Sequence, residues 1–135
     1  AGAQFLFTPH VDIGMIKTAA EQEIPLVAGA LSPTEIVQAW QAGAASVKVF
    51  PIGIMGGVAY IQALRAPLGN IPLIPTGGIT IDNTPAFLQA GAIAVGLSRD
   101  LFPQEALLQG NWDAIALRTQ ALVQRVKSGK ENCEF

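Results

Sequence analysis

The chain has 135 residues, of which 50% are hydrophobic and 13% charged, and its formal net charge is −2. This composition excludes an intrinsically disordered chain and gives enough apolar residues for one globular domain. The small negative charge excludes a broad basic surface, so no nucleic-acid partner is predicted.

Two short phrases alternate along the chain and divide it into repeated units. Ala-Gly-Ala begins at residues 1, 42 and 90, and Ile-Pro-Leu begins at residues 24 and 71. Each phrase leads into a short apolar run, and unbroken apolar runs are typical of a parallel sheet covered on both faces. The runs predict five β-strands: Phe5–Thr8, Pro25–Ala28, Ser46–Phe50, Leu73–Pro75 and Ile93–Gly96.

Helical patterns separate the predicted strands. After the second strand, Ser32 is placed as an N-cap, with Pro33 at the first helical position and Glu35 at the third. Residues 80–91 repeat this arrangement, and residues 111–127 predict a closing amphipathic helix. Three aromatic residues fall at helical core spacing and are predicted to pack in the core: Trp40, Phe87 and Trp112.

This order of elements predicts an α/β fold of right-handed βαβ units with parallel strands. Two architectures fit the order, a doubly wound open sheet and part of a (β/α)8 barrel. A complete barrel usually has about 200–250 residues, so a barrel formed by this chain would be partial, with about three βα units absent at the front.

Cysteine content and hydropathy predict a cytoplasmic protein without membrane association. Cys133 is the only cysteine, and a lone thiol is typical of a reducing compartment. The longest apolar stretch, residues 49–64, is broken by Pro51 and by the Gly56-Gly57 pair. It is also shorter than the roughly 20 residues that a membrane helix needs.

A lysine lies within the third predicted strand, in the segment Val47-Lys48-Val49-Phe50. Along a barrel strand, side chains alternately face the helices and the barrel interior. The two valines are therefore predicted to face the helices, and Lys48 is predicted to face the interior. Active sites of barrels lie at the carboxyl ends of the strands. Burial favours a neutral amine, which can form a Schiff base with a carbonyl compound. The alternative is that Lys48 extends to solvent or pairs with a carboxylate.

Two glycine-containing turns follow the last two predicted strands. Gly77 and Gly78 follow the fourth strand, and Gly96 and Ser98 follow the fifth. Adjacent glycines let backbone N–H groups approach an anion, and barrels often bind phosphate at the loops after their last two strands. The turns therefore predict a phosphate site, although Gly77-Gly78 could also form only a turn. Arg99 either adds a charge to this site or has a surface role.

No metal site is predicted. His10 is the only histidine, and His10 with Asp12 does not supply a convincing ligand set.

Several motifs resemble one enzyme family. AGAQFLFTP, IPLVAGALSPTE, SVKVFP, the glycine pair at 56–57, IPLIPTGGI and GLS occur in the order seen in the 2-keto-3-deoxy-6-phosphogluconate (KDPG) / 4-hydroxy-2-oxoglutarate aldolases. The chain resembles the C-terminal five-eighths of such an enzyme, up to about Leu122. Residues 1–135 would then form the C-terminal part of a single (β/α)8 barrel that lacks its first three βα units.

The resemblance implies a class I aldolase that works without metal or cofactor. The family cleaves a phosphorylated 2-keto-3-deoxy sugar acid to pyruvate and a phosphorylated aldehyde, here glyceraldehyde 3-phosphate. Lys48 matches the Schiff-base lysine, Phe50 an aromatic residue of the pocket, and Pro9 a loop residue beside it. Five further residues match substrate positions. Thr76, Gly77 and Gly78 match residues near the substrate carboxylate and phosphate, and Gly96 and Ser98 match the other side of the phosphate site.

The sequence departs from the family pattern at several places. The family's general-base glutamate, an arginine and a substrate-binding threonine lie on early strands that have no counterpart here. The segment FPIGIMGG and His10 also differ from the usual residues beside the pocket, which leaves the exact substrate open. Two other readings remain. One is another phosphosugar barrel, an isomerase or a thiamine-phosphate-synthase-like enzyme, with Lys48 as an electrostatic ligand. The other is a non-catalytic relative or fragment.

Five strands of an eight-stranded barrel leave two open edges and an uncovered apolar interior. The chain is therefore predicted to be one piece of a larger barrel or to form a homo-oligomer, for which the family resemblance suggests a trimer.

Overall fold

The structure, a computed structural model, describes the backbone of residues 2–131 and the side chains of residues 2–127. Cys133, on which the prediction of a reducing compartment depends, lies outside the described residues. None of the described helices is both long and apolar enough to cross a membrane.

Four parallel strands form one curved sheet in the order β1-β2-β3-β4. The strands are β1 (Leu6–Phe7), β2 (Leu26–Ala30), β3 (Ser46–Val49) and β4 (Leu73–Pro75). The helices are α1 (Ile13–Glu21), α2 (Pro33–Gln41), α3 (Val58–Leu68), α4 (Thr84–Gln89), α5 (Gln104–Leu108) and α6 (Trp112–Glu131), with a 3-10 turn η1 (Gly53–Met55).

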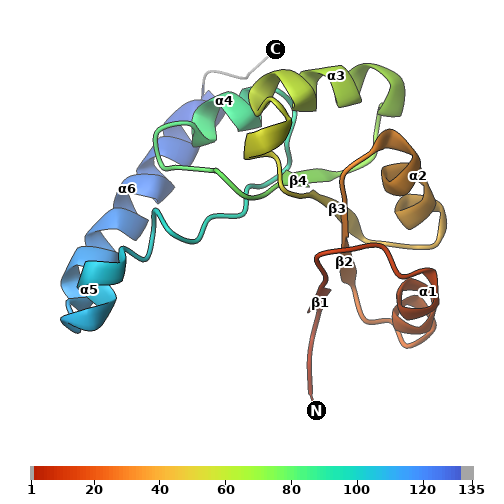
Figure 1. Ribbon diagram of the computed structural model, residues 1–135, viewed down its shortest axis with the longest axis horizontal. Helices are drawn as coiled ribbons and strands as arrows, with labels where there is room; N and C mark the ends of the chain where they lie inside the picture. Colours follow the sequence, from red (N-terminus) through yellow and green to blue (C-terminus); the bar gives the residue numbers. More distant parts are fainter. Residues whose placement is uncertain (1, 132–135) are drawn as a thin grey trace.

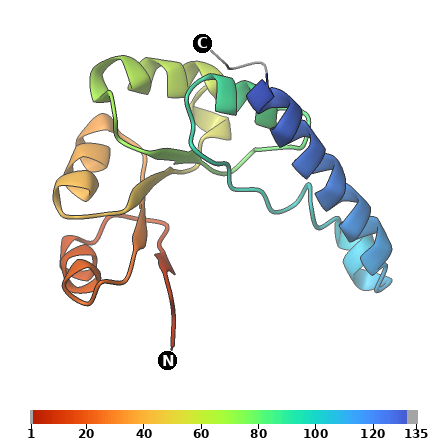
Figure 2. The same ribbon diagram turned by 180° about the vertical axis from the view of Figure 1, so that it is seen from behind.

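The helices line the outside of the curved sheet, which makes the fold a partial α/β barrel (Figure 1, Figure 2). α1, α2 and α3 lie in turn along the outer side of β1 to β4. Beyond α4, the chain continues into α5 and α6, which together extend from the sheet as an arm. The predicted α/β barrel class is confirmed. Because the four strands are parallel, their carboxyl ends all lie at the same edge of the sheet.

Local sequence explains where the first helices begin. The Ser32 hydroxyl accepts the N–H of Glu35, and the Glu35 carboxylate accepts the N–H of Ser32, which is the capping box predicted for α2. α1 begins in the same way, because the carboxylate of Asp12 accepts the N–H of Met15 at 2.9 Å.

The core lies between the sheet and its helices. One face of the sheet is fully buried there and carries Leu26, Ala28, Val47, Val49 and Leu73. The helices contribute Ile16, Ile36 and Ile61, each no more than 1% exposed. Complete burial of an isoleucine or leucine stabilises a fold by about 1.5–3 kcal/mol, so this layer holds the strands in register.

The predicted fifth strand, Ile93–Gly96, is not a strand. It makes only one isolated bridge, between Thr76 and Gly96, and two hydrogen bonds to β4. No described segment pairs with its outer side, and Ile93 is 54% exposed, so little holds the segment extended. The bridge between Gly96 and Thr76 nevertheless places the two glycine turns next to each other.

The prediction for the aromatic residues is correct at one position and wrong at two. Phe87 is 2% exposed in the core, whereas Trp40 is 41% and Trp112 is 67% exposed. Helical spacing identifies an apolar face of α2 and of α6, but no described element covers the part of that face where each tryptophan lies.

Candidate functional site

Lys48 lies on the face of β3 opposite to the helices. Its neighbours across the sheet are Gly29 on β2 and Ile74 on β4, while Val47 and Val49 are fully buried on the helix side. The predicted facing of the valines is confirmed. Lys48 is half-buried on the face that forms the interior of a closed barrel.

Two aromatic rings flank the Lys48 ammonium group. Nζ lies 4.5 Å from the centre of the Phe50 ring and 5.4 Å from the centre of the Phe7 ring. Within residues 2–127, Lys48 makes no salt bridge, so a carboxylate partner is not seen there. Sequence reasoning missed Phe7, although it pairs in register with Val27 and therefore shares the face of Lys48.

The loop after β1 folds back against β2 beside the lysine. The Thr8 hydroxyl accepts the N–H of Gly29 at 3.3 Å and donates to the carbonyl of His10 at 2.8 Å. A Cβ atom on Gly29 would lie 2.2 Å from the carbonyl carbon of Pro9. Pro9, a predicted substrate-binding residue, is thus held against the strand position next to Lys48 because that position is glycine.

The segment after β3 is fixed to the turn after β4. It begins with a cis peptide bond between Phe50 and Pro51. The N–H of Ile52 bonds to the carbonyl of Thr76 at 2.9 Å, and the N–H of Gly53 bonds to the carbonyl of Gly77 at 2.8 Å. Thr76 is thereby placed at the carboxyl end of β4, next to the end of the strand that carries Lys48.

Phe50 connects the lysine to the glycine turn. Two ring carbons of Phe50 lie 3.2 Å from the point where a Cβ on Gly77 would stand, and the same ring lies over Nζ of Lys48. The predicted residues Lys48, Phe50 and Gly77 therefore form a continuous series of contacts.

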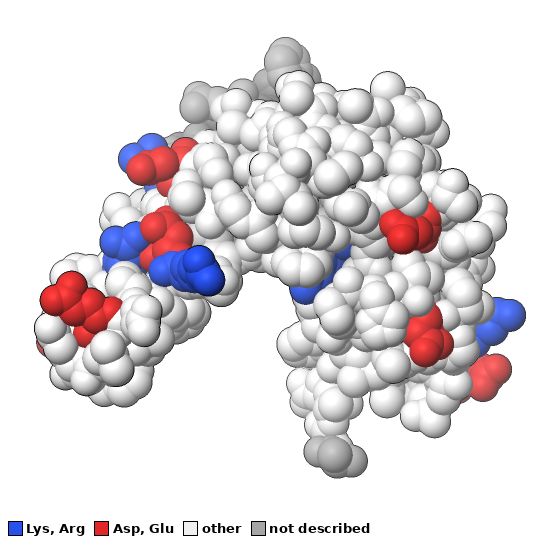
Figure 3. All heavy atoms as spheres, viewed as in Figure 1, with Lys and Arg blue, Asp and Glu red and all other residues white. Residues whose placement is uncertain are grey.

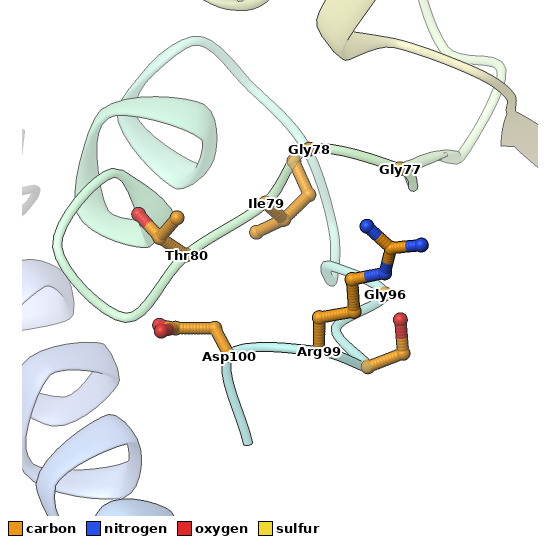
Figure 4. Close-up of a pocket in the computed structure, with 8 residues that line it drawn as sticks. Gly77, Gly78, Ile79, Thr80, Gly96, Arg99 and Asp100 are labelled. Carbon is orange, nitrogen blue, oxygen red and sulfur yellow. The ribbon is translucent and has the colours of Figure 1, made fainter. Parts of the chain in front are cut away.

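A cavity of about 500 Å³ lies between the two glycine turns (Figure 4). All four residues predicted to bind phosphate line it: Gly77, Gly78, Gly96 and Ser98. The four other lining residues are Ile79, Thr80, Arg99 and Asp100. Lys48, Phe50, Pro9 and Thr76 do not line the cavity, so the structure divides the predicted site into two adjacent parts.

Backbone donors in the cavity wall are free to bind an anion. In the part of the chain that the structure describes, the N–H groups of Gly77, Gly78 and Ser98 have no acceptor, and the Ser98 hydroxyl has no hydrogen bond. Gly77 and Gly78 have φ values of +85° and +86°, a conformation that glycine adopts without a steric penalty. The turn therefore exposes successive N–H groups, which is the arrangement that anion sites use.

Asp100 joins the cavity wall to α6. One of its carboxylate oxygens accepts the N–H of Ile81 at 2.6 Å, and the other pairs with the guanidinium of Arg118 at 2.5 Å. Arg118 also donates to the Asp100 carbonyl. Both carboxylate oxygens are thus occupied, and the charge of Asp100 is offset by Arg118.

No metal centre is visible in this region. Among the described residues, no three His, Cys, Asp or Glu side chains lie together as a metal site would require. His10 is exposed, and it takes part in the contacts around Pro9 through its backbone carbonyl and amide nitrogen.

The parallel order of the strands, with lysine on the inner face and glycine turns at the strand ends, defines a barrel protein with its candidate site at the carboxyl ends of the strands. A family model described as KDPG and KHG aldolase matches residues 1–117. The chain belongs to this aldolase family, which confirms the resemblance inferred from its motifs.

Relatives agree with this assignment over most of the chain. The 2-dehydro-3-deoxy-phosphogluconate aldolase of Dickeya dadantii is 35% identical over 123 residues, 90% of this chain and 58% of the relative. A native KDPGal structure is 28% identical with a TM-score of 0.86, over 96% of this chain and 61% of that one. A KDPG aldolase from Legionella pneumophila, with pyruvate captured at low pH as a covalent carbinolamine intermediate, is 28% identical with a TM-score of 0.77. That match covers 90% of this chain and 57% of the Legionella chain. The chain thus spans less than two thirds of the length of these relatives.

Proposed function

We propose that this chain carries the Schiff-base lysine and the phosphate-binding turns of a class I aldolase. The substrate is a 2-keto-3-deoxy-6-phosphogluconate-type acid, and the products are pyruvate and glyceraldehyde 3-phosphate. The observation that carries the proposal is the series of contacts from Lys48 through Phe50 to Gly77 beside the cavity. The covalent pyruvate adduct of the Legionella relative supports it.

Lys48 is the nucleophile in this proposal. Its neutral amine attacks the ketone carbon of the substrate, and loss of water from the resulting carbinolamine gives an imine. When the C3–C4 bond breaks, its electron pair moves into the imine, the aldehyde leaves, and an enamine remains. Protonation of the enamine and hydrolysis then release pyruvate and restore the amine. Phe7 and Phe50 cover Nζ and reduce its contact with water.

The proton transfers need a group that the described residues do not supply. No carboxylate in residues 2–127 is paired with Lys48, and the resemblance assigns the family's glutamate base to strands with no counterpart in this chain. The proposal therefore places the base outside residues 1–135 and assigns the covalent step alone to this segment, as the C-terminal part of a single barrel.

The remaining predicted residues divide between the two ends of the substrate. Thr76 and Pro9, which lie at the strand ends beside Lys48, are proposed to contact the carboxylate end. Gly77, Gly78 and Ser98 are proposed to bind the phosphate through their free N–H groups and the Ser98 hydroxyl. Gly96, whose N–H already bonds to the carbonyl of Pro75, is proposed to contact the phosphate from the other wall of the cavity. No metal or cofactor takes part. We also propose a cytoplasmic homo-oligomer, a trimer by family resemblance, because no described strand pairs with the outer edge of β1.

Borohydride reduction in the presence of pyruvate, followed by peptide mapping, tests the proposal. The full-length gene product should acquire a reduced pyruvyl adduct on Lys48, and Lys48→Met should abolish it. Lys17→Met is the matched control, because Lys17 is exposed on α1, and it should leave trapping unchanged.

Absence of an adduct on Lys48 in the complete protein would overturn the proposal. Phosphosugar binding with turnover but without trapping would favour an isomerase or a thiamine-phosphate-synthase-like enzyme, in which Lys48 acts as a charge. Binding without any turnover would favour a non-catalytic relative.

A further inference from the structure

The cavity between the glycine turns holds one cation whose charge is not used elsewhere. Among the described residues, Arg99 makes no hydrogen bond and no ion pair. The other described arginines are engaged. Arg65 bonds to backbone carbonyls, Arg118 to Asp100 and Arg125 to Asp82.

The orientation of Arg99 brings this charge to the glycine turns. Figure 4 shows its guanidinium group directed towards Gly77 and Gly96, whereas the Asp100 carboxylate points away towards Thr80. Arg99 follows Ser98 directly, so the guanidinium, the free Ser98 hydroxyl and the free N–H groups of the turn surround one space.

The charge balance of the cavity favours an anion. Asp100 is the only acidic residue among the eight lining residues, and its carboxylate is paired with Arg118 and bonded to the N–H of Ile81. With Asp100 offset in this way, Arg99 supplies a net positive charge to the wall. A guanidinium matches the geometry of a phosphate oxygen pair and binds a dianion more strongly than neutral donors do.

We infer that Arg99 is a specificity-determining residue that makes the site prefer substrates with a terminal phosphate dianion over those with a neutral or singly charged end. The inference rests on the proposed aldolase function and adds to it the selectivity between substrate classes. Backbone N–H groups can donate to either class of substrate, whereas the free guanidinium of Arg99 adds a full positive charge that gains most from the doubly charged group.

Kinetics of the full-length gene product with two substrates test this inference. 2-Keto-3-deoxy-6-phosphogluconate carries the phosphate, and 4-hydroxy-2-oxoglutarate does not. Arg99→Gln should lower kcat/KM for the phosphorylated substrate by about tenfold to a hundredfold, because a charge-assisted hydrogen bond is lost. It should change kcat/KM for 4-hydroxy-2-oxoglutarate by less than about twofold, and Arg99→Lys should recover part of the loss.

Arg125→Gln is the matched control, since it removes the same charge from α6 outside the cavity lining. It should leave the ratio of the two kcat/KM values unchanged. An equal loss on both substrates, or no loss on the phosphorylated one, would overturn the inference.

Two further measurements separate this inference from the aldolase proposal. If pyruvate is trapped on Lys48 but Arg99→Gln leaves the substrate ratio unchanged, the inference fails and the proposed function stands. If neither trapping nor turnover occurs, calorimetric titration with inorganic phosphate still tests Arg99. Weaker binding by Arg99→Gln but not by Arg125→Gln supports the role of Arg99, and equal binding overturns it.

Discussion

Gly29 and Pro9 lie so close together that no side chain fits between them. A Cβ atom on Gly29 would stand 2.2 Å from the carbonyl carbon of Pro9 and 2.6 Å from the amide nitrogen of His10. Both are backbone atoms, and the Thr8 hydroxyl bonds to the backbone of Gly29 and His10. Because Gly29 pairs in register with Lys48, this contact fixes the loop beside the lysine.

Gly29→Ala should therefore destabilise the fold and disturb the lysine site. Overpacking against backbone typically costs about 1–3 kcal/mol, and the displaced loop should also reduce pyruvate trapping on Lys48. Urea unfolding and borohydride trapping measure the two effects.

Gly14→Ala in α1 is the control, because its added Cβ would meet only the Asp12 side chain, at 3.3 Å. Alanine is favoured over glycine within helices by about 0.5–1 kcal/mol, which offsets a small shift of the Asp12 carboxylate that caps α1, so stability should change by less than about 1 kcal/mol. An unchanged unfolding midpoint for Gly29→Ala would contradict the proposed packing.

Ser98→Ala should separate ligand binding from stability at the cavity. Ser98 is exposed and its hydroxyl has no hydrogen bond within residues 2–127, so the free energy of unfolding should change by less than about 0.5 kcal/mol. Loss of one hydrogen bond to the anion should weaken binding of inorganic phosphate by about threefold to tenfold, measured by calorimetry. Ser98→Thr retains a hydroxyl and should keep most of the affinity. Unaltered phosphate affinity in Ser98→Ala would remove Ser98 from the proposed site.

Arg65 stabilises the connection between α3, β4 and α4. Its guanidinium donates to the carbonyls of Gly69 and Ile71, each at 2.8 Å, and to the carbonyl of Gly91. Arg65→Met leaves these acceptors without their donor and should cost about 1–3 kcal/mol, measured by urea unfolding.

Arg125→Met provides the comparison for Arg65. Arg125 pairs with Asp82 at 3.0 Å, and the two side chains are 54% and 84% exposed, so its loss should cost less than about 1 kcal/mol. Equal effects of the two substitutions would contradict a structural role for the Arg65 contacts.

Glu35 should make stability depend on pH in the acidic range. Hydrogen bonds from the N–H groups of Ser32 and Leu31, and from the Ser32 hydroxyl, lower the pKa of Glu35 below its usual value near 4.5. The charged carboxylate therefore stabilises the folded state above pH 4.5, and this contribution is lost as the pH falls through the lower pKa of the folded state.

Glu35→Gln should flatten the fall in stability on acidification, measured by urea unfolding at a series of pH values. Ser32→Ala is the companion variant, which should cost about 1 kcal/mol at neutral pH because the N-cap hydroxyl is lost. If the free energy of unfolding falls equally on acidification in Glu35→Gln and in the parent chain, the capping box does not cause that fall.

Sequence alone predicts β1, β2, β3, β4 and the start of α2 because local signals determine them. Apolar runs mark strands whose one face is buried, and Ser32 with Glu35 marks a helix start. The segment Ile93–Gly96 has the same apolar run, but a strand also needs a pairing partner, which the run itself does not specify. The predicted burial of Trp112 was wrong for a similar reason. Helical spacing identifies the apolar face of a helix, but it does not show whether another element covers that face.

The features of the candidate site also fall into those that local sequence predicts and those that depend on tertiary contacts. The inward position of Lys48 follows from strand alternation, and Phe7 could have been found by the same rule once register was known. Sequence could not predict the contact of Gly29 with Pro9 or the orientation of Arg99. Each of them depends on how segments distant in sequence fold against each other.

The exposed apolar surface predicts that the 135-residue chain does not remain a monomer. Phe5 is 64% exposed beside β1, whose outer edge has no partner among the described strands, and on the arm Leu108 is 81% and Trp112 67% exposed. The space-filling view shows the surface hollowed between the β1 end of the molecule and the arm (Figure 3). Such open edges and apolar patches associate in water.

Native mass spectrometry and sedimentation at micromolar concentration should therefore detect multiples of 14.1 kDa. Phe5→Asp places a charge beside the unpaired edge and should shift the equilibrium towards smaller species, because a buried unpaired charge opposes strand association. Glu105→Asp on α5 keeps its charge at an exposed position and should leave the distribution unchanged. A stable monomer of the parent chain at all these concentrations would show that the exposed edge and arm do not drive association.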